Sequence, residues 1–471
     1  MFKSLFATAA LLAAATVTTA HQDVLNIHGS GTTNPSKCIW AIMEDFMDQS
    51  KHPIRMTYRA VGSGTGIAEF INGNSSVPAA DFGSGDLPLP KDAYDGLIAN
   101  NVGVLHLPIL LSAVSVFHNV PGLEVLDLDA CLLARIFSRK IKSWGDEAIV
   151  VRNPSLDGST LQISVARRVL GSSSTDSITN YLCKACPQEW DLGVGPLIEW
   201  PEDTLPCEGS GGVTTCITEL PGTIGYLDAG HGHAEGLPEI ELVNLNGTSQ
   251  NSKKAGERGG IASAMAEAEG ELPTNAREDW SNVSLLNRPG QYTWPIVLLT
   301  YIYVREDLSY LNDPDEQTLL KAFLKALYDD NYVQQCVSDH DFTLPPASIK
   351  NFAVAAIDSL AVSENATEWT IESSTAPIVA TGDFVISQKR RTHNEVERDV
   401  LMDQVAELML RVAEMEVMVS DSQIEMQRVA DDNFDKDAML TISLVLGIIG
   451  TVLSLMLAGC FLNQFFHKPH A

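Results

Sequence analysis

Residues 165–182 read VARRVLGSSSTDSITNYL, and this stretch gives the first indication of fold and chemistry. Two arginines and a glycine precede four hydroxyl residues, 172–175, and a run with helical spacing follows. A strand that leads through a Gly/Ser turn into a helix leaves free N–H groups at the helix start, where the helix dipole favours an anion. Arg168 would add a planar, permanently charged donor suited to an oxyanion. The alternative is a serine-rich helix cap beside a surface arginine, so other segments must decide.

The totals limit the classes of partner. The chain has 471 residues, of which 45% are hydrophobic, enough for a large core and more than one domain. Its net charge of −29 argues against nucleic acid and against an anionic membrane surface as partners. A small anion would have to be held by local dipoles and one or two arginines.

The N-terminus has the pattern of a secretory signal peptide over residues 1–20. Lys3 is the charged start, residues 5–17 are apolar, and small residues precede a cleavage site before His21. This pattern predicts a mature chain in the secretory pathway, where disulfides persist. Four sequons are then glycosylation candidates, at Asn74, Asn246, Asn282 and Asn365.

Eight cysteines are present, and seven of them lie outside the apolar C-terminal stretch that holds Cys460. Cys207 and Cys216 flank a glycine-rich loop and are predicted to form a disulfide. Cys183 and Cys186 have the spacing of a redox motif, but in a secreted chain a structural bridge between them, or pairing with more distant cysteines, is favoured over catalysis. The odd number leaves a free thiol or an intermolecular bond.

Three further turns repeat the opening pattern. Residues 25–35, LNIHGSGTTNP, read as a strand that enters a Gly/Thr turn before a helix. Residues 54–66 read as a strand ending in GSGTG, again before a helical run. Residues 81–86, DFGSGD, form a third glycine-rich turn that carries Asp86. Each turn alone is weak evidence, because glycine turns are common.

Two long apolar runs are predicted to be buried strands. They are residues 105–117, LHLPILLSAVSVF, and residues 294–304, WPIVLLTYIYV. The first is expected to cross between two lobes, and the second to return. Helices are expected over 319–327 and 348–362, while 248–282 has no clear assignment.

The C-terminal part follows a linker with some strand character over residues 366–392. Apolar residues then recur in steps of four and three, which predicts a coiled-coil stalk over 393–436 and a homo-oligomer through 401–429. The positions concerned are Leu401, Val405, Leu408, Val412, Met415, Val419, Ser422, Met426 and Val429. An amphipathic helix folded back on the globular part is the alternative.

Residues 438–462 contain no charge and are long enough to span a bilayer. Together with the signal peptide, they predict a single-pass type I membrane protein at the cell surface or in an endomembrane, with a cytosolic tail over 463–471. The globular part would then be extracellular or lumenal. A C-terminal lipid-anchor signal is the alternative.

Taken together, five segments resemble the phosphate-binding proteins of bacterial ABC phosphate transporters (PstS-like). They are GSGTTNP, YRAVGSGTGI, ADFGSGDLPL, ARRVLGSSST and LPGTIGYLDA, and the similarity runs from about residue 25 to 362. The resemblance implies an α/β, two-lobed periplasmic-binding-protein type II fold with hinge crossover strands over 21–365. Lobe 1 would take about 21–110 and 300–365, and lobe 2 about 111–299, with the anion held between them.

The resemblance also implies which residues would bind phosphate. Carried over position by position, they are Thr33, Asn34, Ser63, Asp86, Arg168, Ser172, Ser173 and Ser174. Asn34 replaces an aromatic residue whose backbone N–H is the binding group. Ser173 stands where the family usually has glycine, and Ser174 where it has threonine. Leu170 replaces an aspartate that orients the arginine in the family.

Asp86 would select among anions. Its carboxylate can accept a hydrogen bond from a protonated ligand oxygen, whereas sulfate, which carries no proton near neutral pH, would meet unpaired repulsion. The sequence therefore favours a membrane-anchored extracytoplasmic receptor for inorganic phosphate, acting in uptake or sensing, with no cofactor.

Two other classes of function remain as alternatives. An enzyme such as a phosphatase is disfavoured, because His231 and His233 lack carboxylate partners of clear spacing and no serine has a visible paired base. A structural or adhesive surface protein that reuses the fold, or a binder of another oxyanion, is the second alternative.

Overall fold

The computed structural model describes residues 24–72, 77–372 and 382–431. These residues belong to two compact units, divided between Arg390 and Arg391. The expected signal peptide, the stretch 438–462, the tail 463–471 and Asn74 lie outside the described residues. Within the described part of the chain, no helix is both long and apolar enough to cross a membrane.

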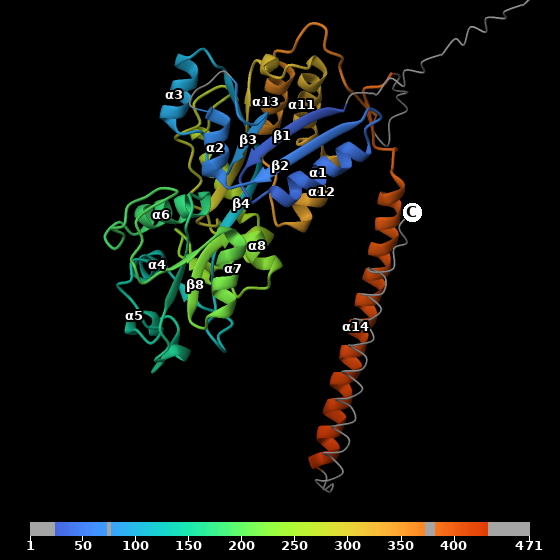
Figure 1. Cartoon of the computed structure of the whole chain (residues 1–471). Helices are drawn as coiled ribbons and strands as arrows, with labels where there is room; N and C mark the ends of the chain where they lie inside the picture. Colours follow the sequence, from blue (N-terminus) through green and yellow to red (C-terminus); the bar gives the residue numbers. More distant parts are fainter. Residues whose placement is uncertain (1–23, 73–76, 373–381, 432–471) are drawn as a thin grey trace, which may run out of the picture. The chain divides into compact units, whose positions relative to one another are not determined.

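The first unit is built on one sheet of eight strands in the order β2-β1-β3-β11-β4-β8-β6-β7. Figure 1 shows this sheet running through the whole unit. The strands are β1 (Leu25–Gly31), β2 (Ile54–Ala60), β3 (Phe82–Gly85), β4 (Val104–His118), β6 (Ser164–Arg168), β7 (Leu205–Cys207), β8 (Thr223–Asp228) and β11 (Val297–Arg305).

Strand β4 divides the sheet into two lobes. Its residues 104–113 pair antiparallel with β11, and residues 114–118 pair antiparallel with β8. We call the part around β1, β2 and β3 lobe 1, and the part around β6, β7 and β8 lobe 2. Every residue of β4 and of β11 is buried, which explains why both runs are apolar without alternation. The predicted crossing strand β4 is therefore the strand at which the lobes join, while β11 lies between β3 of lobe 1 and residues 104–113 of β4.

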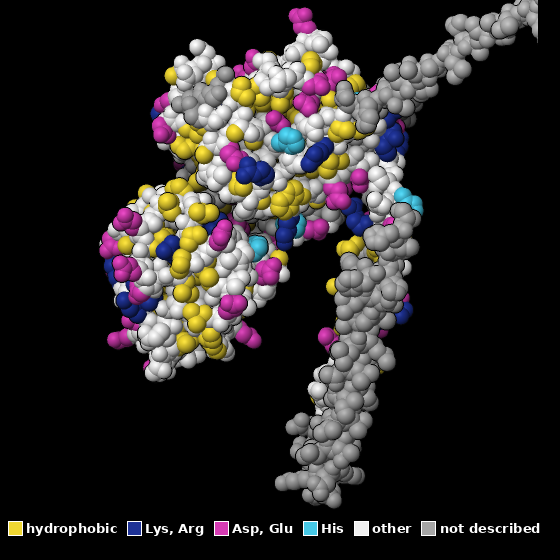
Figure 2. Space-filling model, viewed as in Figure 1, with side chains coloured by type: hydrophobic (Ala, Val, Ile, Leu, Met, Phe, Trp, Pro, Cys, Tyr) yellow, Lys and Arg dark blue, Asp and Glu magenta, His cyan; other side chains and the backbone are white. Residues whose placement is uncertain are grey.

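Helices pack on both faces of the sheet (Figure 1). Around lobe 1 lie α1 (Ser36–Asp48), α2 (Ser63–Ile71), α3 (Lys91–Ala99), α11 (Pro314–Ala326), α12 (Asp330–Asp339) and α13 (Ala347–Asp358). Around lobe 2 lie α4 (Ala130–Phe137), α5 (Glu147–Val150), α6 (Ser173–Ala185), α7 (Gly209–Glu219) and α8 (Ala229–Ala234). The space-filling view shows a waist between the lobes, and acidic side chains scattered over both of them (Figure 2).

Helix α1 illustrates how the sequence pattern becomes packing. Ile39, Ile42, Met43 and Phe46 recur at helical spacing, and all four are buried. The ring of Phe46 meets the ring of Phe323 from α11 edge to face, with centroids 6.0 Å apart. Such contacts hold the buried face of α1 against α11.

Two segments had no predicted structure, and a third was predicted as a linker with some strand character. Residues 248–282 contain β10 (Ser249–Gln250), α9 (Ser252–Glu257) and α10 (Gly260–Ala268), and β10 joins β9 (Glu241–Val243) and β5 (Asp127–Leu128) in a small sheet. Helix α12 was not predicted. The expected linker contributes β12 (Thr370–Glu372) and β13 (Val385–Ser387), and Ile386 is fully buried.

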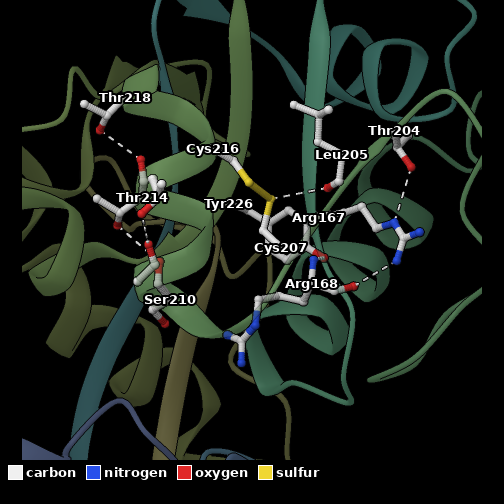
Figure 3. Close-up of a disulfide and its surroundings, with 12 residues drawn as sticks. Arg167, Arg168, Thr204, Leu205, Cys207, Ser210, Thr214, Cys216, Thr218 and Tyr226 are labelled. Atoms are coloured by element: carbon white, nitrogen blue, oxygen red, sulfur yellow. Dashed lines mark hydrogen bonds between the residues drawn. A yellow bond between two sulfur atoms is a disulfide. The ribbon is translucent and has the colours of Figure 1, made fainter. Parts of the chain in front are cut away.

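The cysteine pattern is partly as expected. The predicted Cys207–Cys216 disulfide is present and ties β7 to α7 (Figure 3). Cys183 is not bridged to Cys186, and the alternative, pairing with a more distant cysteine, is confirmed for Cys186. Cys186 lies buried at the end of α6 and pairs with Cys131 on the adjacent α4, whereas Cys183 is exposed and free. A third disulfide joins Cys38 on α1 to Cys336 on α12.

Over the described residues of the second unit, the chain forms one long helix, α14 (His393–Asp431), of 39 residues. At 1.5 Å per residue it is about 60 Å long. The helical part of the predicted stalk is therefore present over these residues. Its association with a second copy remains a prediction.

Candidate functional site

The predicted turns meet at the carboxyl ends of parallel strands. Those after β1 and β2 open α1 and α2, the turn after β3 carries Asp86, and the turn after β6 opens α6. Ligands of open α/β sheets bind in the crevice at this edge. The turns face each other across the two lobes, since a Cβ built on Gly62 or Gly64 would lie 3.6 or 3.7 Å from the carbonyl oxygen of Gly171.

Asp86 accepts hydrogen bonds from both lobes in this crevice. It is 2% exposed, and its Oδ2 accepts hydrogen bonds from Thr32 Oγ1 at 2.5 Å and Ser173 Oγ at 3.0 Å. Its Oδ1 accepts from Thr300 Oγ1 at 2.6 Å, and its backbone N–H donates to Ser63 Oγ at 3.2 Å. An ionised carboxylate has about four acceptor sites, so three hydroxyls leave one available.

The surroundings of Asp86 also raise its affinity for a proton. Burial raises the pKa of its carboxyl to about 6, the negative charge of Asp228 adds to the rise, and the three hydroxyl donors oppose it. The carboxyl is therefore ionised at neutral pH but close to its point of protonation. Such a group can accept a proton from a ligand oxygen or share one with it.

Asp228, at the end of β8, is a second buried carboxylate that the sequence did not single out. Its Oδ1 accepts from Ser174 Oγ at 3.3 Å, and its Oδ2 accepts from Ser210 Oγ at 3.0 Å. The hydroxyl of Ser174 is thus directed at a carboxylate of its own lobe.

Ser172 has the role of helix cap that was the alternative for the opening stretch. Its Oγ accepts from the backbone N–H of Ser174 at 3.2 Å and of Thr175 at 3.4 Å. The cap and the crevice are compatible, since Ser173 in the same turn reaches Asp86 in lobe 1.

Arg168 lies at the end of β6 and is 5% exposed. Its backbone N–H donates to the hydroxyl of Tyr226, while its side-chain Nε is buried with no hydrogen-bond partner among the described residues. The neighbouring Arg167 points the other way, toward Thr204 (Figure 3). Leu170 is 58% exposed and offers Arg168 no acceptor. A buried guanidinium nitrogen without a partner is costly, and a bound anion would satisfy it.

Thr33 and Asn34 stand just before α1. The carbonyl of Thr33 accepts from the Ser36 N–H at 3.3 Å, and Asn34 Nδ2 donates to Ser112 Oγ on β4 at 2.8 Å. Both residues line a cavity of about 300 Å³ that Asp228 also lines. Asp86 lines a second cavity, of about 780 Å³, between the lobes. We call these two cavities together the cleft, and Arg168 is among the lining residues of neither.

Two site residues, Thr300 and Asp228, were missed from the sequence, and Thr32 was recognised as a turn hydroxyl but not counted among the phosphate ligands. Each had a local signal. Thr32 is adjacent to Thr33 in the first turn, Thr300 is the one polar residue in WPIVLLTYIYV, and Asp228 ends a strand before small residues. The sequence pattern at the helix starts identified the turns, but it could not identify side chains that reach the site from strands.

The expectation that His233 lacks carboxylate partners was wrong, because the fold brings two carboxylates to its ring. His233 lies between Glu239 and Asp341, 2.9 Å from a carboxylate oxygen of each. Over the residues that the structure describes, His, Cys, Asp and Glu side chains form no group of three or more suited to a metal ion.

Comparison with protein families gives a match to the PBP superfamily domain over residues 15–331. The chain belongs to the PBP superfamily. Relatives in this family include two proteins named as phosphate-binding protein PstS. That of Methanocaldococcus jannaschii is 29% identical over 312 residues, 63% of this chain and 77% of its own length. That of Xylella fastidiosa is 28% identical over 305 residues, 63% of this chain and 76% of its own length.

Solved structures support the fold. A phosphate-binding protein from Stenotrophomonas maltophilia superimposes with a TM-score of 0.54 at 19% identity, over 70% of this chain and 93% of that structure. The expectation of an α/β binding-protein fold with two lobes is confirmed for the globular unit.

Proposed function

We propose that this PBP superfamily member binds inorganic phosphate in the cleft between its lobes, and that it acts as a binding protein rather than an enzyme. The observation that carries the proposal is that two charged groups at strand ends are buried and incompletely satisfied. Asp86 keeps one acceptor site, and Arg168 keeps a guanidinium nitrogen with no partner among the described residues. The names of the PstS relatives support the same ligand.

Each group would have a distinct task. Arg168 supplies positive charge and paired N–H donors for two ligand oxygens. The starts of α1, α2 and α6, which carry Thr33, Ser63 and Ser173, add N–H donors and helix dipoles. Asp86 accepts a hydrogen bond from the protonated oxygen of a hydrogen phosphate, and sulfate carries no such proton at neutral pH.

The cellular setting extends this proposal. The pattern of residues 1–20 and the apolar stretch 438–462 support a receptor anchored by one membrane span, with the cleft outside the cytosol, for uptake or sensing of phosphate. The a/d pattern within α14 supports a homo-oligomer. The exposed Asn246, Asn282 and Asn365 are the glycosylation candidates among the described residues.

A second candidate ligand, another tetrahedral oxyanion, is favoured by one observation. Leu170 leaves Arg168 without the carboxylate that the resemblance led us to expect beside it. A less firmly oriented guanidinium discriminates less sharply among anions of similar shape.

Isothermal titration calorimetry of the full chain tests the proposal. Phosphate, arsenate and sulfate are titrated at pH 7.5. Tight binding of phosphate with sulfate ignored is the expected result. Arg168→Gln should weaken phosphate binding by at least about 100-fold, because the loss leaves an anion without its charged partner. Arg167→Gln is the matched control, since Arg167 points away from the cleft, and it should bind normally. Absence of heat with all three anions would overturn the proposal and favour a structural or adhesive role.

A further inference from the structure

The cleft is much larger than one phosphate ion requires. The cavity that Asp86 lines has a volume of about 780 Å³ and extends from Asp86 along α6 to the loop 281–286. Its floor is β11, and its apolar lining includes Leu89 and Leu298. Cavities of 300–1,000 Å³ are of the size that holds organic ligands.

Asp176 is the feature of this cavity that the phosphate site does not use. It lies in the first turn of α6 and lines the cavity together with Asn180, Cys183 and Lys184, which follow along the same side of the helix. Burial raises the pKa of the Asp176 carboxyl to about 6, and a hydrogen bond from Asn180 opposes the rise. No cationic side chain contributes to the pKa shift of Asp176.

The two lysines of the cavity have partners elsewhere. Lys91 pairs with Asp95 at 2.9 Å and with Asp279 at 3.3 Å. Lys184 donates to the carbonyl oxygen of Leu286 at 2.9 Å. Asp176 is therefore a shielded carboxylate that faces a large cavity without an ion pair among the described residues.

We propose that the cleft takes organic phosphates or phosphonates that carry a short cationic arm, with the phosphate group at Asp86 and Arg168 and the arm's amine at Asp176. The inference rests on the proposed function, since it uses the same anion site.

The positions along α6 set the length of the arm. Ser173, which contacts Asp86, and Asp176 are three residues apart and lie on nearly the same side of the helix. The helix rises about 4.5 Å over three residues. An arm of two or three carbons spans that interval, and a bare alkyl group of the same length would leave Asp176 uncompensated.

Calorimetry of the full chain with three probes tests this inference. The probes are inorganic phosphate, ethyl phosphate and 2-aminoethyl phosphate, all titrated at pH 6.5, where a proton is readily available to be shared between Asp86 and an ester oxygen. The amine-bearing ester should bind about 10-fold or more tightly than ethyl phosphate, as expected for a charged hydrogen bond. In Asp176→Asn that preference should fall to about twofold or less, with inorganic phosphate unaffected.

The outcomes separate the two proposals. Equal affinities for the two esters, or a preference that persists in Asp176→Asn, would overturn the inference while leaving phosphate binding intact. Binding of inorganic phosphate with neither ester bound would do the same. Failure of inorganic phosphate itself would overturn both. Asp157→Asn, at an exposed position outside the cavity, is the control for the loss of one negative charge.

Discussion

The hydroxyl of Ser173 at the start of α6 donates a hydrogen bond of 3.0 Å to the carboxylate of Asp86 in the other lobe. This bond links the lobes across the cleft at the point where an anion would be held. Thr300 gives Asp86 a second hydroxyl, at 2.6 Å, from β11, which pairs with β3 of lobe 1. Both hydrogen bonds have Asp86 as the acceptor, but only the one from Ser173 joins lobe 2 to lobe 1.

Ser173→Ala should weaken phosphate binding by about 3- to 10-fold, the worth of one hydrogen bond to a charged group. The loss also removes a contact between the lobes, so small-angle scattering should show a more open average shape. Thr300→Val is the matched variant, because it removes a hydroxyl from Asp86 without cutting a bond between the lobes. Equal opening in both variants, or in neither, would show that Ser173 does not hold the lobes together.

Asp86→Asn should relax the selectivity of the cleft. An amide at this position can donate as well as accept, so sulfate no longer meets an unpaired negative charge. We expect the ratio of phosphate to sulfate affinity to fall by about 10- to 100-fold. Competition calorimetry on the variant measures that ratio, and Asp228→Asn is the comparison, since Asp228 is occupied by Ser174 and Ser210. If the ratio of phosphate to sulfate affinity is unchanged in Asp86→Asn, another group accepts the hydrogen bond from the protonated ligand oxygen.

Asp86 should also make stability depend on pH. Its folded-state pKa of about 6 is above the ordinary value of 3.8, so between these pH values the folded protein binds more protons than the unfolded chain. The contribution of this group to the free energy of unfolding therefore falls as pH rises through that window, by at most about 3 kcal/mol.

Chemical denaturation at pH 4.0 and pH 7.5 measures this effect. Asp86→Asn should be more stable than the parent chain at pH 7.5 and close to it at pH 4.0, where Asp86 is already protonated. A gain of the same size at both pH values would assign the effect to packing instead of charge.

The local parts of this site were predictable from the sequence, because turns at helix starts have local signals. Glycine and hydroxyl residues after a strand identified the turns that hold Thr33, Ser63 and Ser173. Thr300 was not predictable in this way, since it reaches Asp86 from 214 residues away along the chain. A lone threonine in a buried strand does not say which carboxylate it faces.

Disulfide pairing shows the same division. Cys207 and Cys216 close a short loop, and their pairing followed from the sequence between them. Cys131 and Cys186 pair because α4 packs on α6, and Cys38 and Cys336 because α12 lies beside α1. Helix α12 itself was not predicted, so its partner cysteine on α1 could not be identified. Contacts of this kind depend on tertiary packing.

Removing each disulfide should lower the free energy of unfolding by an amount that depends on the length of the loop it closes. Cys38 and Cys336 are 298 residues apart, and Cys207 and Cys216 only 9. In the chain-entropy model, the long loop contributes about 3 kcal/mol more to the free energy of unfolding. Paired Cys→Ser variants of each bridge, compared by urea denaturation, test this. Equal losses would indicate that strain or residual structure in the unfolded chain dominates.

Thiol chemistry should distinguish Cys183 from the six bridged cysteines. Cys183 is exposed and free, so iodoacetamide should label it in the native, unreduced chain. Peptide mass mapping before and after reduction checks the assignment. Labelling of Cys131 or Cys186 without reductant would contradict the bridge between them.

The long helix should associate through its a/d positions. A single helix cannot bury Leu408 and Met415 by itself, and burial of such side chains drives coiled-coil formation. Light scattering on the full chain in detergent should give an oligomer, and Leu408→Lys combined with Met415→Lys should give a monomer. The matched control is Leu410→Lys with Val417→Lys, which has the same spacing but changes the exposed side of the helix opposite these positions. A monomeric parent chain would favour the alternative of an amphipathic helix folded back on the globular unit. If both double variants dissociate, the added charge and not its position on the helix separates the copies.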